Sequence, residues 1–434
     1  MWNKVQAYIK QQRLLDADRK HLVALSGGAD SVALLLILRR LGYNVEAAHC
    51  NFHLRGEESD RDEQFVCALC EQENTPLHRA HYDTKTYAEL HHVSIEMAAR
   101  ELRYRYFEQL RHDIGADEIC VAHHQDDAVE TLLINLVRGT GIHGLTGIRP
   151  RNGHIVRPLL CVSRTEIVDY LSTLNQNYVT DSSNLVPDVV RNKIRLNVMP
   201  LLHDINPAAA ANIARTAHRL AEVECVFDRS IENILNEHFK DGTLDIETIR
   251  QYDAPECLLH ELLAPRGFRP SQIEQLADSL DAPSGRIFQS ATHEVAIDRG
   301  RIVVDCRRQP PPPLRIPETG TYNYANRQFR FTVYGCAQIS KSPCCATLDA
   351  DKVRFPLTVR PIQSGDRFHP FGMTGSRLVS DYLTDRKRSV FEKRRQLVVT
   401  DAEGCIVWLV GERTDQRFCI DPTTSRTLQA EWLG

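Results

Sequence analysis

The sequence predicts an α/β fold, namely a doubly wound, mainly parallel sheet followed by a helical middle domain and a small mixed α/β C-terminal domain. Between residues 22 and 138, short apolar runs alternate with longer helical segments, as in successive βαβ units. The first run leads through a turn with two adjacent glycines into an apolar run long enough for a helix. Helical patterns begin near residue 206, and four prolines at residues 310–313 indicate a later boundary.

The first part of the chain is expected to alternate strands and helices. Residues 22–25 are apolar and too few for a helix, which favours a buried parallel strand. The expected strands cover residues 22–25, 45–49, 77–82 and 118–122, and the expected helices cover residues 32–38, 58–73, 95–113 and 128–138. Ligands of such sheets bind beyond the carboxyl ends of the strands. We therefore expect Ser26, His49 and His123, each placed just past a strand, to converge.

The later part of the chain is predicted to change from helices to short strands. The expected helices cover residues 208–220, 222–238, 256–263 and 270–279, and the expected strands cover residues 294–297, 301–305, 328–334, 357–362, 397–400 and 406–410. These patterns predict four segments: domains at residues 1–205, 206–308 and 349–434, and a linker with a proline-rich start at residues 309–348.

The composition is that of an ordinary globular protein, with 42% hydrophobic and 25% charged residues among 434. The sequence has no long apolar span and no basic-then-apolar signal at its N-terminus. The 13 cysteines are scattered and odd in number, so we expect reduced thiols and a cytoplasmic location. The net charge of −4 does not indicate a nucleic-acid-binding protein, but residues 376–395 hold seven basic and three acidic side chains. This stretch is either a solvated helix face or a contact to phosphates.

The turn from Ser26 to Ser31, Ser26-Gly27-Gly28-Ala29-Asp30-Ser31, carries the clearest chemical signal. Between a strand and a helix, such a turn aims backbone N–H groups and the positive end of the helix dipole at one point, which suits a phosphate. Asp30 would repel a phosphate unless Mg²⁺ lies between them, so we expect Asp30 to be a Mg²⁺ ligand. No lysine lies between His21 and Arg39, which excludes a Walker A loop. A plain glycine-rich turn remains the alternative.

Two further groups of polar residues are candidates for chemistry. His123 lies at a strand end, where it suits a phosphate contact, and Asp126 and Asp127 are expected to cap the helix that follows. A metal site is the alternative, but ligands on separate helices are not evident. Arg100 and Arg103 lie on one face of the helix at residues 95–113, either as ordinary partners of nearby acids or as a grip for phosphoryl charge.

Together these segments resemble the tRNA(Ile)-lysidine synthetases of the N-type ATP pyrophosphatase, or PP-loop, superfamily. The matching segments are SGGADS, HCNFHLRGEESDRDE, EMAARELRYRYF, AHHQDDAVETLLINLVRGTGIHGLTGI, IVRPLL and TDSSN…RNKIR…MPLL, with RPIQSGDRFHPFGM…SDYLTDRKRS and VWLVGERTDQRF near the C-terminus. The first loop is shared by several families, whereas RGTGxxGLxG after AHHxDDxxET is more specific. Residues 220–345 carry little that matches.

The resemblance implies a two-step reaction on an isoleucine tRNA with the anticodon CAU. ATP, with Mg²⁺, would adenylate the C2 oxygen of the wobble cytidine, cytidine 34, and release pyrophosphate. The ε-amine of free lysine would then displace AMP and leave lysidine. The tRNA and lysine are the implied partners, no membrane is involved, and a monomer or a homodimer is left open.

The resemblance also implies roles for residues at the matching positions. ATP would be bound by Ser26, Gly27, Gly28, Ala29, Asp30 and Ser31. The implied catalytic residues are Asp30, Arg100, Arg103 and His123. On the lysine or tRNA side the resemblance places Asp126, Asp127, Glu130, Thr131, Arg138, Gly139, Arg191, Asn192 and Arg195, with Gly141 and Gly144 in the same loop as Gly139. In the C-terminal domain, Arg377, Arg386, Lys387 and Arg388 would contact the tRNA.

Two alternatives stay open. A tRNA thiolase shares the first loop and adenylates a base before it delivers sulfur, and Cys67-Ala68-Leu69-Cys70 supplies a candidate redox pair. Buried core thiols are the competing interpretation, since the pair lies on an expected helix. The second alternative is a non-catalytic tRNA- or nucleotide-binding protein, against which the intact Asp30 and His123 argue.

Overall fold

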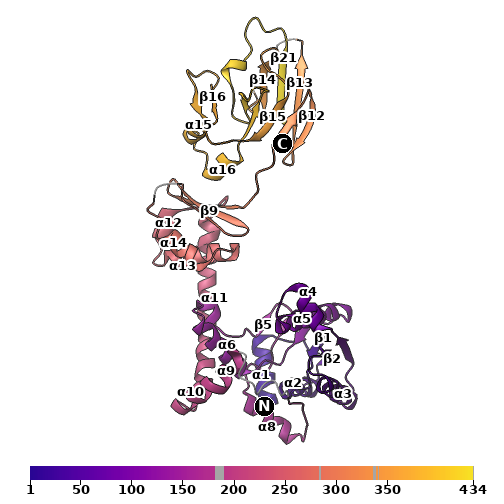
Figure 1. Cartoon of the computed structure of the whole chain (residues 1–434). Helices are drawn as coiled ribbons and strands as arrows, with labels where there is room; N and C mark the ends of the chain where they lie inside the picture. Colours follow the sequence, from indigo (N-terminus) through magenta and orange to yellow (C-terminus); the bar gives the residue numbers. More distant parts are fainter. Residues whose placement is uncertain (181–189, 283–284, 336–338, 341, 434) are drawn as a thin grey trace. The chain divides into compact units, whose positions relative to one another are not determined.

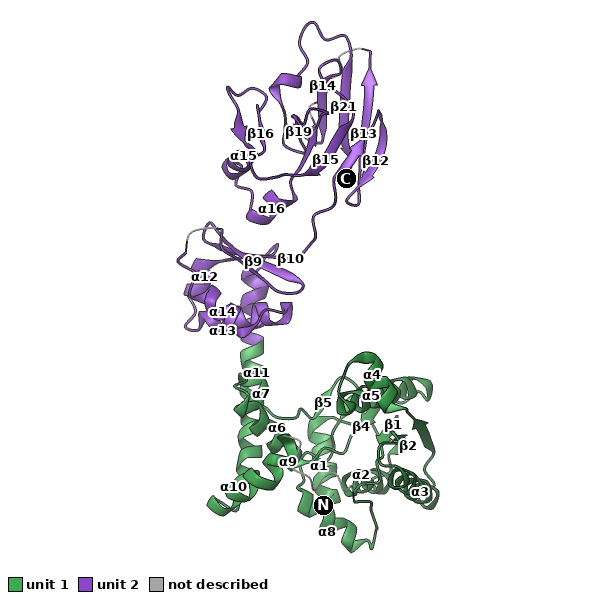
Figure 2. Cartoon of the chain, in the orientation of Figure 1, with its two compact units in different colours: residues 1–228 green, residues 229–434 purple. Residues whose placement is uncertain are grey.

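The computed structural model describes residues 1–180, 190–282, 285–335, 339–340 and 342–433, which form two compact units, Met1–Asp228 and Arg229–Gly434 (Figure 2). Residues 181–184 of the TDSSN segment lie outside the described residues. None of the described helices combines the length and apolar character needed to span a membrane. The domain boundaries predicted from the sequence stay predictions.

The first unit is built on a six-stranded sheet in the order β3-β2-β1-β4-β6-β5 (Figure 1). Its strands are β1 (Lys20–Ala24), β2 (Asn44–Asn51), β3 (Leu77–His81), β4 (Glu118–Cys120), β5 (Arg151–Asn152) and β6 (Ile155–Val156). All neighbouring pairs are parallel except β5 with β6. The predicted doubly wound, mainly parallel sheet is confirmed.

Helices cover both faces of this sheet because β1 is apolar on both sides. Val23 packs in a cluster with residues of α2, α3 and α8, whereas Leu22 packs with Phe107 and Leu110 of α5. Successive side chains of a strand point to opposite faces, which explains the division. The helices are α1 (Trp2–Gln12), α2 (Ala29–Arg40), α3 (Glu57–Gln72), α4 (Thr84–His91), α5 (Ile95–Asp113), α6 (Gln125–Val137), α7 (Ile142–Leu145) and α8 (Arg164–Thr173).

The strand order places a crevice beside β1. The chain runs from β1 to β2 and β3 on one side and then crosses to β4 on the other. Such a switch point is where open α/β sheets bind ligands. Ser26 follows β1 and His123 follows β4, so both lie at this crevice. His49 was expected just past its strand, but it lies within β2, where its Nδ1 is 2.9 Å from the carbonyl oxygen of Leu25.

Helices end the first unit. They are α9 (Val190–Lys193), a π-helical turn (Ile194–Val198), α10 (Met199–Ile205) and α11 (Ala209–His238). The prediction of two helices at residues 208–220 and 222–238 is wrong, because α11 is one continuous helix. Ala221 joins the two expected segments, and alanine has the highest helix propensity of all residues.

The second unit begins with a small sheet and three helices. Antiparallel strands pair in the order β7-β10-β9-β8 and pack against helices α12, α13 and α14 around Leu244, Leu259 and Ile297. Their bounds are β7 (Thr243–Asp245), α12 (Ile246–Arg250), α13 (Pro255–Leu263), α14 (Pro270–Ala277), β8 (Ile287–Gln289), β9 (His293–Asp298) and β10 (Arg301–Cys306).

The rest of the second unit is mostly β-structure. Two sheets, β11-β15-β18-β19-β20 and β12-β13-β21-β14, share one core around Phe329, Phe331 and Trp408. The segment predicted as a linker contains β11, β12 and β13, because alternate residues such as Phe329 and Phe331 are buried in that core. The elements are β11 (Leu314–Ile316), β12 (Gly320–Tyr324), β13 (Arg327–Tyr334), β14 (Cys345–Asp349), β15 (Leu357–Pro361), β16 (Arg367–Phe368), β17 (Arg377–Leu378), α15 (Val379–Asp385), α16 (Val390–Arg395), β18 (Leu397–Thr400), β19 (Ile406–Leu409), β20 (Arg413–Thr414) and β21 (Thr427–Leu433).

Candidate active site

A glycine and two serine side chains fix the conformation of the turn after β1. Gly27 has a φ of +89°, and a Cβ at this position would lie 3.2 Å from Cγ2 of Val66, so glycine is needed. The Ser31 hydroxyl donates to the carbonyl oxygen of Gly28 at 3.0 Å and lies 3.1 Å from the Ser26 hydroxyl. Gly28 is the N-cap of α2, a helix of 12 residues, with no side-chain cap. The free N–H groups of this helix end form a ready anion site.

Asp30 lies in the first turn of α2, in contact with cationic groups. The Arg164 guanidinium from the start of α8 donates to its carboxylate, and Nε2 of His124 lies 3.8 Å from Oδ1 of Asp30. Because this carboxylate sits beside the anion site and already attracts a guanidinium, it fits a divalent cation that bridges it to a phosphate.

The start of α6 differs from the expected one. The helix begins at Gln125, three residues before the expected position, so Asp126 and Asp127 lie in its first turn and His124 is the N-cap. The Asp127 carboxylate accepts the His124 backbone N–H at 3.0 Å, and the Asp126 carboxylate accepts the Arg164 backbone N–H at 2.7 Å. The two aspartates favour a charged His124: burial alone would lower its pKa, but their charges and that of Asp30 raise it.

His123 leaves the end of β4 with a partly buried ring. Nε of Arg157 donates to Nδ1 of His123 at 3.1 Å, and Arg157 is 8% exposed. Burial is the main reason that the pKa of His123 falls to about 4. The Asp127 charge raises this pKa, and the Arg157, Arg191 and Arg100 charges lower it. The ring is therefore neutral near pH 7.

The two arginines of α5 lie at different places. Arg100 is among the charges that act on His123, and its guanidinium lies 5.0 Å from the centre of the Tyr104 ring. Arg103 instead lies 5.1 Å from the centre of the Phe52 ring, just past the end of β2. The Arg100 charge thus acts on the histidine, whereas Arg103 lies against Phe52.

Glu130 and Arg195 form a buried ion pair between α6 and the π-helical turn. Glu130 is 2% exposed, and its two oxygens accept from Nε and Nη2 of Arg195 at 2.6 and 2.9 Å. Nη2 of Arg191 donates to the Thr131 hydroxyl at 2.8 Å, and Asn192 lies between the two arginines in sequence. Both Glu130 oxygens are thus occupied, whereas Oδ1 of Asp127 has only a 3.5 Å contact to Arg195.

The glycine-rich loop after α6 is fixed to α11. Gly139 has a φ of +73° and ends α6 after the exposed Arg138, and Gly141 is the N-cap of α7. Within α7, the carbonyl oxygen of Gly144 accepts from the Asn135 side chain at 2.8 Å, and His143 lies 2.6 Å from the buried carboxylate of Glu224.

Comparisons with known proteins identify the domains and the family of this chain. Residues 1–202 match the family model described as the PP-loop domain, and residues 238–307 match the one described as the TilS substrate binding domain. A tRNA(Ile)-lysidine synthase of Bacteroides thetaiotaomicron is 47% identical over 425 residues, which cover 98% of each chain. Another, of Parabacteroides distasonis, is 46% identical over 440 residues and covers 100% of both chains.

The chain belongs to the tRNA(Ile)-lysidine synthase family. Among solved structures, the U34-tRNA thiolase NcsA of Methanococcus maripaludis, with its [4Fe-4S] cluster, is 17% identical with a TM-score of 0.42. That match covers 51% of this chain and 78% of the thiolase chain, and it is too weak to support a sulfur-transfer activity.

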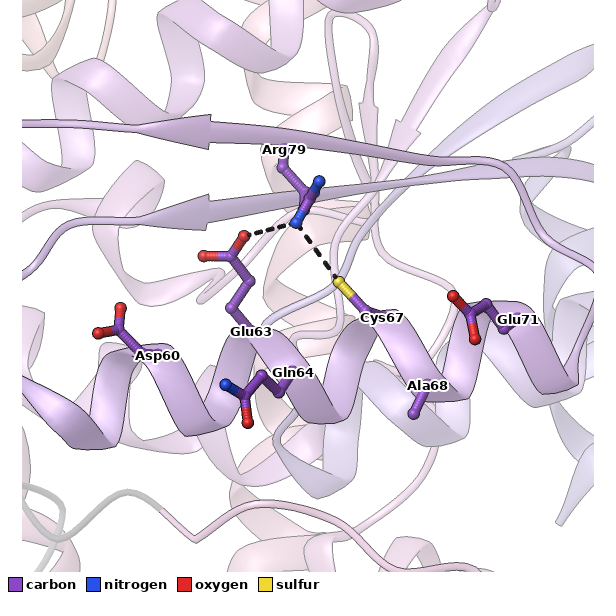
Figure 3. A pocket seen from close by; sticks show the side chains of 7 residues that line it. All are labelled: Asp60, Glu63, Gln64, Cys67, Ala68, Glu71 and Arg79. Carbon is purple, nitrogen blue, oxygen red and sulfur yellow. Dashed lines mark hydrogen bonds and ion pairs between the residues drawn. The ribbon is translucent and has the colours of Figure 1, made fainter.

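The cysteine pair does not suit the thiolase alternative either. Sγ of Cys67 lies 3.8 Å from Nη1 of Arg79 in a pocket on the outer face of α3 and β3 (Figure 3). Cys70 is 2% exposed in the core of the family's PP-loop domain, and burial raises its pKa to about 12. Cys70 is therefore a core residue and not an attacking thiolate, which would need access and a low pKa.

In the C-terminal part of the family fold, three of the four predicted tRNA contacts have intramolecular partners. Arg377 pairs with Asp385 at 2.6 Å, Arg388 pairs with Glu412 at 2.6 Å, and Arg386 lies over the Tyr382 ring. Lys387 is exposed at the turn after α15. The phosphate-binding role of this stretch stays a prediction, and the structure favours Lys387 within it.

Sequence reasoning missed two site residues of this family member, Arg157 and Arg164. Arg157 is part of the IVRPLL segment, but its role depends on β6 lying beside β4, which the expected strands did not include. Arg164 begins α8 and reaches Asp30 across the sheet edge. The sequence signal for Arg157 was a basic residue just past a strand, and the signal for Arg164 was a basic residue at the start of a helix.

Proposed function

We propose that this chain ligates lysine to C2 of the wobble cytidine of tRNA(Ile) with a CAU anticodon, with ATP as co-substrate. The observation that carries the proposal is the anion site at the start of α2, which has Asp30 in its first turn and follows β1, the parallel neighbour of the strand that precedes His123. Whole-length similarity to named tRNA(Ile)-lysidine synthases supports the same assignment. The tRNA, lysine and a cytoplasmic location belong to this proposal, and a homodimer is left to experiment.

In the first step the turn after β1 binds the ATP phosphates, and the wobble base presents its C2 oxygen to the α-phosphate. Asp30 would hold Mg²⁺, which neutralises phosphate charge when bound. Arg100 and the Nε2 side of neutral His123 then stabilise the charge that develops on the α-phosphate oxygens. The C2 oxygen bonds to the α-phosphate as the bond between the α- and β-phosphates breaks and pyrophosphate leaves. The oxygen thereby becomes part of an AMP ester, which is a better leaving group.

In the second step the ε-amine of lysine attacks C2 and displaces AMP. The amine must be neutral, so a carboxylate that holds the ammonium form and accepts its proton is required. Asp127 suits this role better than Glu130, because both Glu130 oxygens are bound by Arg195. Glu130 and Arg195 instead form an ion pair beside the position proposed for lysine.

The intermediate offers the sharpest test. The protein is incubated with ATP labelled at the α-phosphate and CAU-anticodon tRNA(Ile) without lysine, and label in the tRNA is counted. We expect labelled tRNA that releases AMP when lysine is added but not when a sulfur donor is added. Matched tRNA with uridine in place of the wobble cytidine should stay unlabelled. Release by the sulfur donor alone would favour a thiolase, and no label with any tRNA would contradict adenylation.

A further inference from the structure

A buried guanidinium faces one ring nitrogen of His123. Arg157 directly follows β6 and His123 follows β4, and these neighbouring parallel strands bring the two side chains to the same sheet edge. Nε of Arg157 donates to Nδ1 of His123 at 3.1 Å. Nη1 of Arg157 donates to the carbonyl oxygen of Arg149 at 2.8 Å, which fixes the guanidinium plane.

The donor chemistry of arginine then decides where the histidine proton lies. A guanidinium has only N–H donors and no lone pair, so the facing Nδ1 must be the nitrogen that accepts. The neutral ring therefore carries its proton on Nε2. A proton on Nδ1 would turn two N–H donors toward each other, and a doubly protonated ring would in addition bring two positive charges together.

Burial of His123 and three of the four charged groups that act on it favour a neutral ring. Arg100 from α5, Arg191 from α9 and Arg157 oppose a positive ring, and Asp127 from α6 favours one. Three guanidiniums against one carboxylate, together with burial, keep the ring neutral. His123 is thus an N–H donor and cannot accept a proton on Nδ1 while Arg157 is in place.

We propose that Arg157 is a positioning residue that fixes His123 in its neutral Nε2–H form, so that this N–H donates to an anionic oxygen of the adenylate. The identity of that oxygen rests on the proposed function. The tautomer itself does not, since it follows from the hydrogen bond alone. One consequence is that His123 does not deprotonate lysine, which leaves this task to the aspartates of α6.

Nitrogen NMR of the ligand-free protein tests the tautomer directly. With ¹⁵N-labelled histidine, the His123 signals are identified as those lost in His123→Gln. We expect a protonated Nε2 and an unprotonated Nδ1 throughout pH 6–8 in the wild type. In Arg157→Met we expect a mixture of tautomers. A protonated Nδ1 in the wild-type ring would overturn the proposal, whether or not the protein makes lysidine.

Kinetics test whether the tautomer matters. We expect Arg157→Met to lower the rate of tRNA adenylation by about 10- to 100-fold with little change in the KM for ATP, by analogy with outer residues that orient a catalytic histidine. The matched control is Arg151→Met, since Arg151 also donates to backbone carbonyls, those of Arg13 and Leu14, but not to His123.

Substitution of the histidine gives a second readout that does not require the arginine variant to fold. The side-chain amide N–H of glutamine reaches about as far as Nε2, and that of asparagine about as far as Nδ1. We expect His123→Gln to retain more adenylation than His123→Asn. The reverse order, or an unaffected adenylation rate in a folded Arg157→Met, would overturn the positioning role.

Discussion

At the scale of single residues, the two neighbouring histidines of the site, His123 and His124, have different electrostatic surroundings. Burial and three arginines lower the pKa of His123, whereas Asp126, Asp127 and Asp30 raise that of His124, the next residue. The pKa values of two adjacent histidines are thus shifted in opposite directions by their different neighbours. In the proposed function His123 serves the phosphate, and His124 contacts the carboxylates proposed to meet Mg²⁺ and lysine.

Asp30 gives the most direct prediction at this scale. In Asp30→Asn we expect tRNA-dependent ATP cleavage to fall by about 100-fold or more, because the amide has no charge to bind a divalent cation. Thermal unfolding should change little, since asparagine has the shape of aspartate and its amide oxygen can still accept from Arg164. Asp113→Asn, at the exposed end of α5, is the control. Unchanged ATP cleavage in Asp30→Asn would exclude the metal role.

At the scale of elements, neighbouring strands are joined by a carboxylate that the mechanism does not use. Nζ of Lys20 on β1 and Nε2 of His78 on β3 each lie 2.7 Å from an oxygen of Glu46 on β2. Burial alone would raise the pKa of Glu46, but these partners lower it below its ordinary value of 4.5.

The stabilising effect of Glu46 therefore depends on pH with a defined sign. Its pKa is lower in the folded than in the unfolded chain, so its contribution is present above pH 4.5 and is lost as the pH falls through the folded value. In urea unfolding at about pH 5.5 we expect Glu46→Gln to cost about 1–2 kcal/mol. The difference in the free energy of unfolding between wild type and Glu46→Gln should become smaller at about pH 3.5. A larger difference at that pH would contradict the stabilising role of the ionised Glu46.

The contact between α11 and the loop that contains α7 gives a second prediction at the scale of elements. Glu224 of α11 is 4% exposed and accepts from Arg149 at 2.8 Å while it contacts His143 of α7. We expect Glu224→Gln to raise the KM for tRNA several-fold, because the loop loses its fixed position, and to leave the KM for ATP unchanged. Glu222→Gln, exposed on the same helix, is the matched control. If Glu224→Gln changed the KM for ATP as much as the KM for tRNA, its effect would not be confined to the loop.

The strands and helices of the first unit were largely predictable because each carries its own apolar period. The helix at residues 95–113 is observed with the expected bounds, Ile95–Asp113, since Ser94 caps it and apolar residues repeat along one face. β21 was missed: it carries polar Gln429 and Glu431 and forms only by pairing with β13 and β14, which lie far away in sequence. The Arg157–His123 contact was missed for the same reason, because it depends on strand order.

At the scale of the whole molecule, the PP-loop domain carries the chemistry and the second unit carries a predicted tRNA contact. Two of its four expected contacts, Arg377 and Arg388, are paired with carboxylates, and Arg386 lies over the Tyr382 ring, so we favour the exposed Lys387. A lysine that contacts a phosphate releases a counterion, and its loss lowers the salt dependence of binding.

We therefore expect Lys387→Ala to weaken tRNA binding and to reduce the slope of log Kd against log salt by about 1. ATP binding should not change. Lys10→Ala, an exposed lysine on α1, should leave the slope as it is in the wild type. If both variants change the slope equally, the contact at Lys387 is not specific.

The central claim concerns the product, and the most direct measurement is the identity of nucleoside 34 after reaction. CAU-anticodon tRNA(Ile) is incubated with the protein, ATP, Mg²⁺ and lysine, digested to nucleosides and analysed by mass spectrometry. We expect cytidine 34 to be converted to lysidine only when both ATP and lysine are present. An unmodified cytidine 34, or one that carries sulfur instead, would contradict that claim.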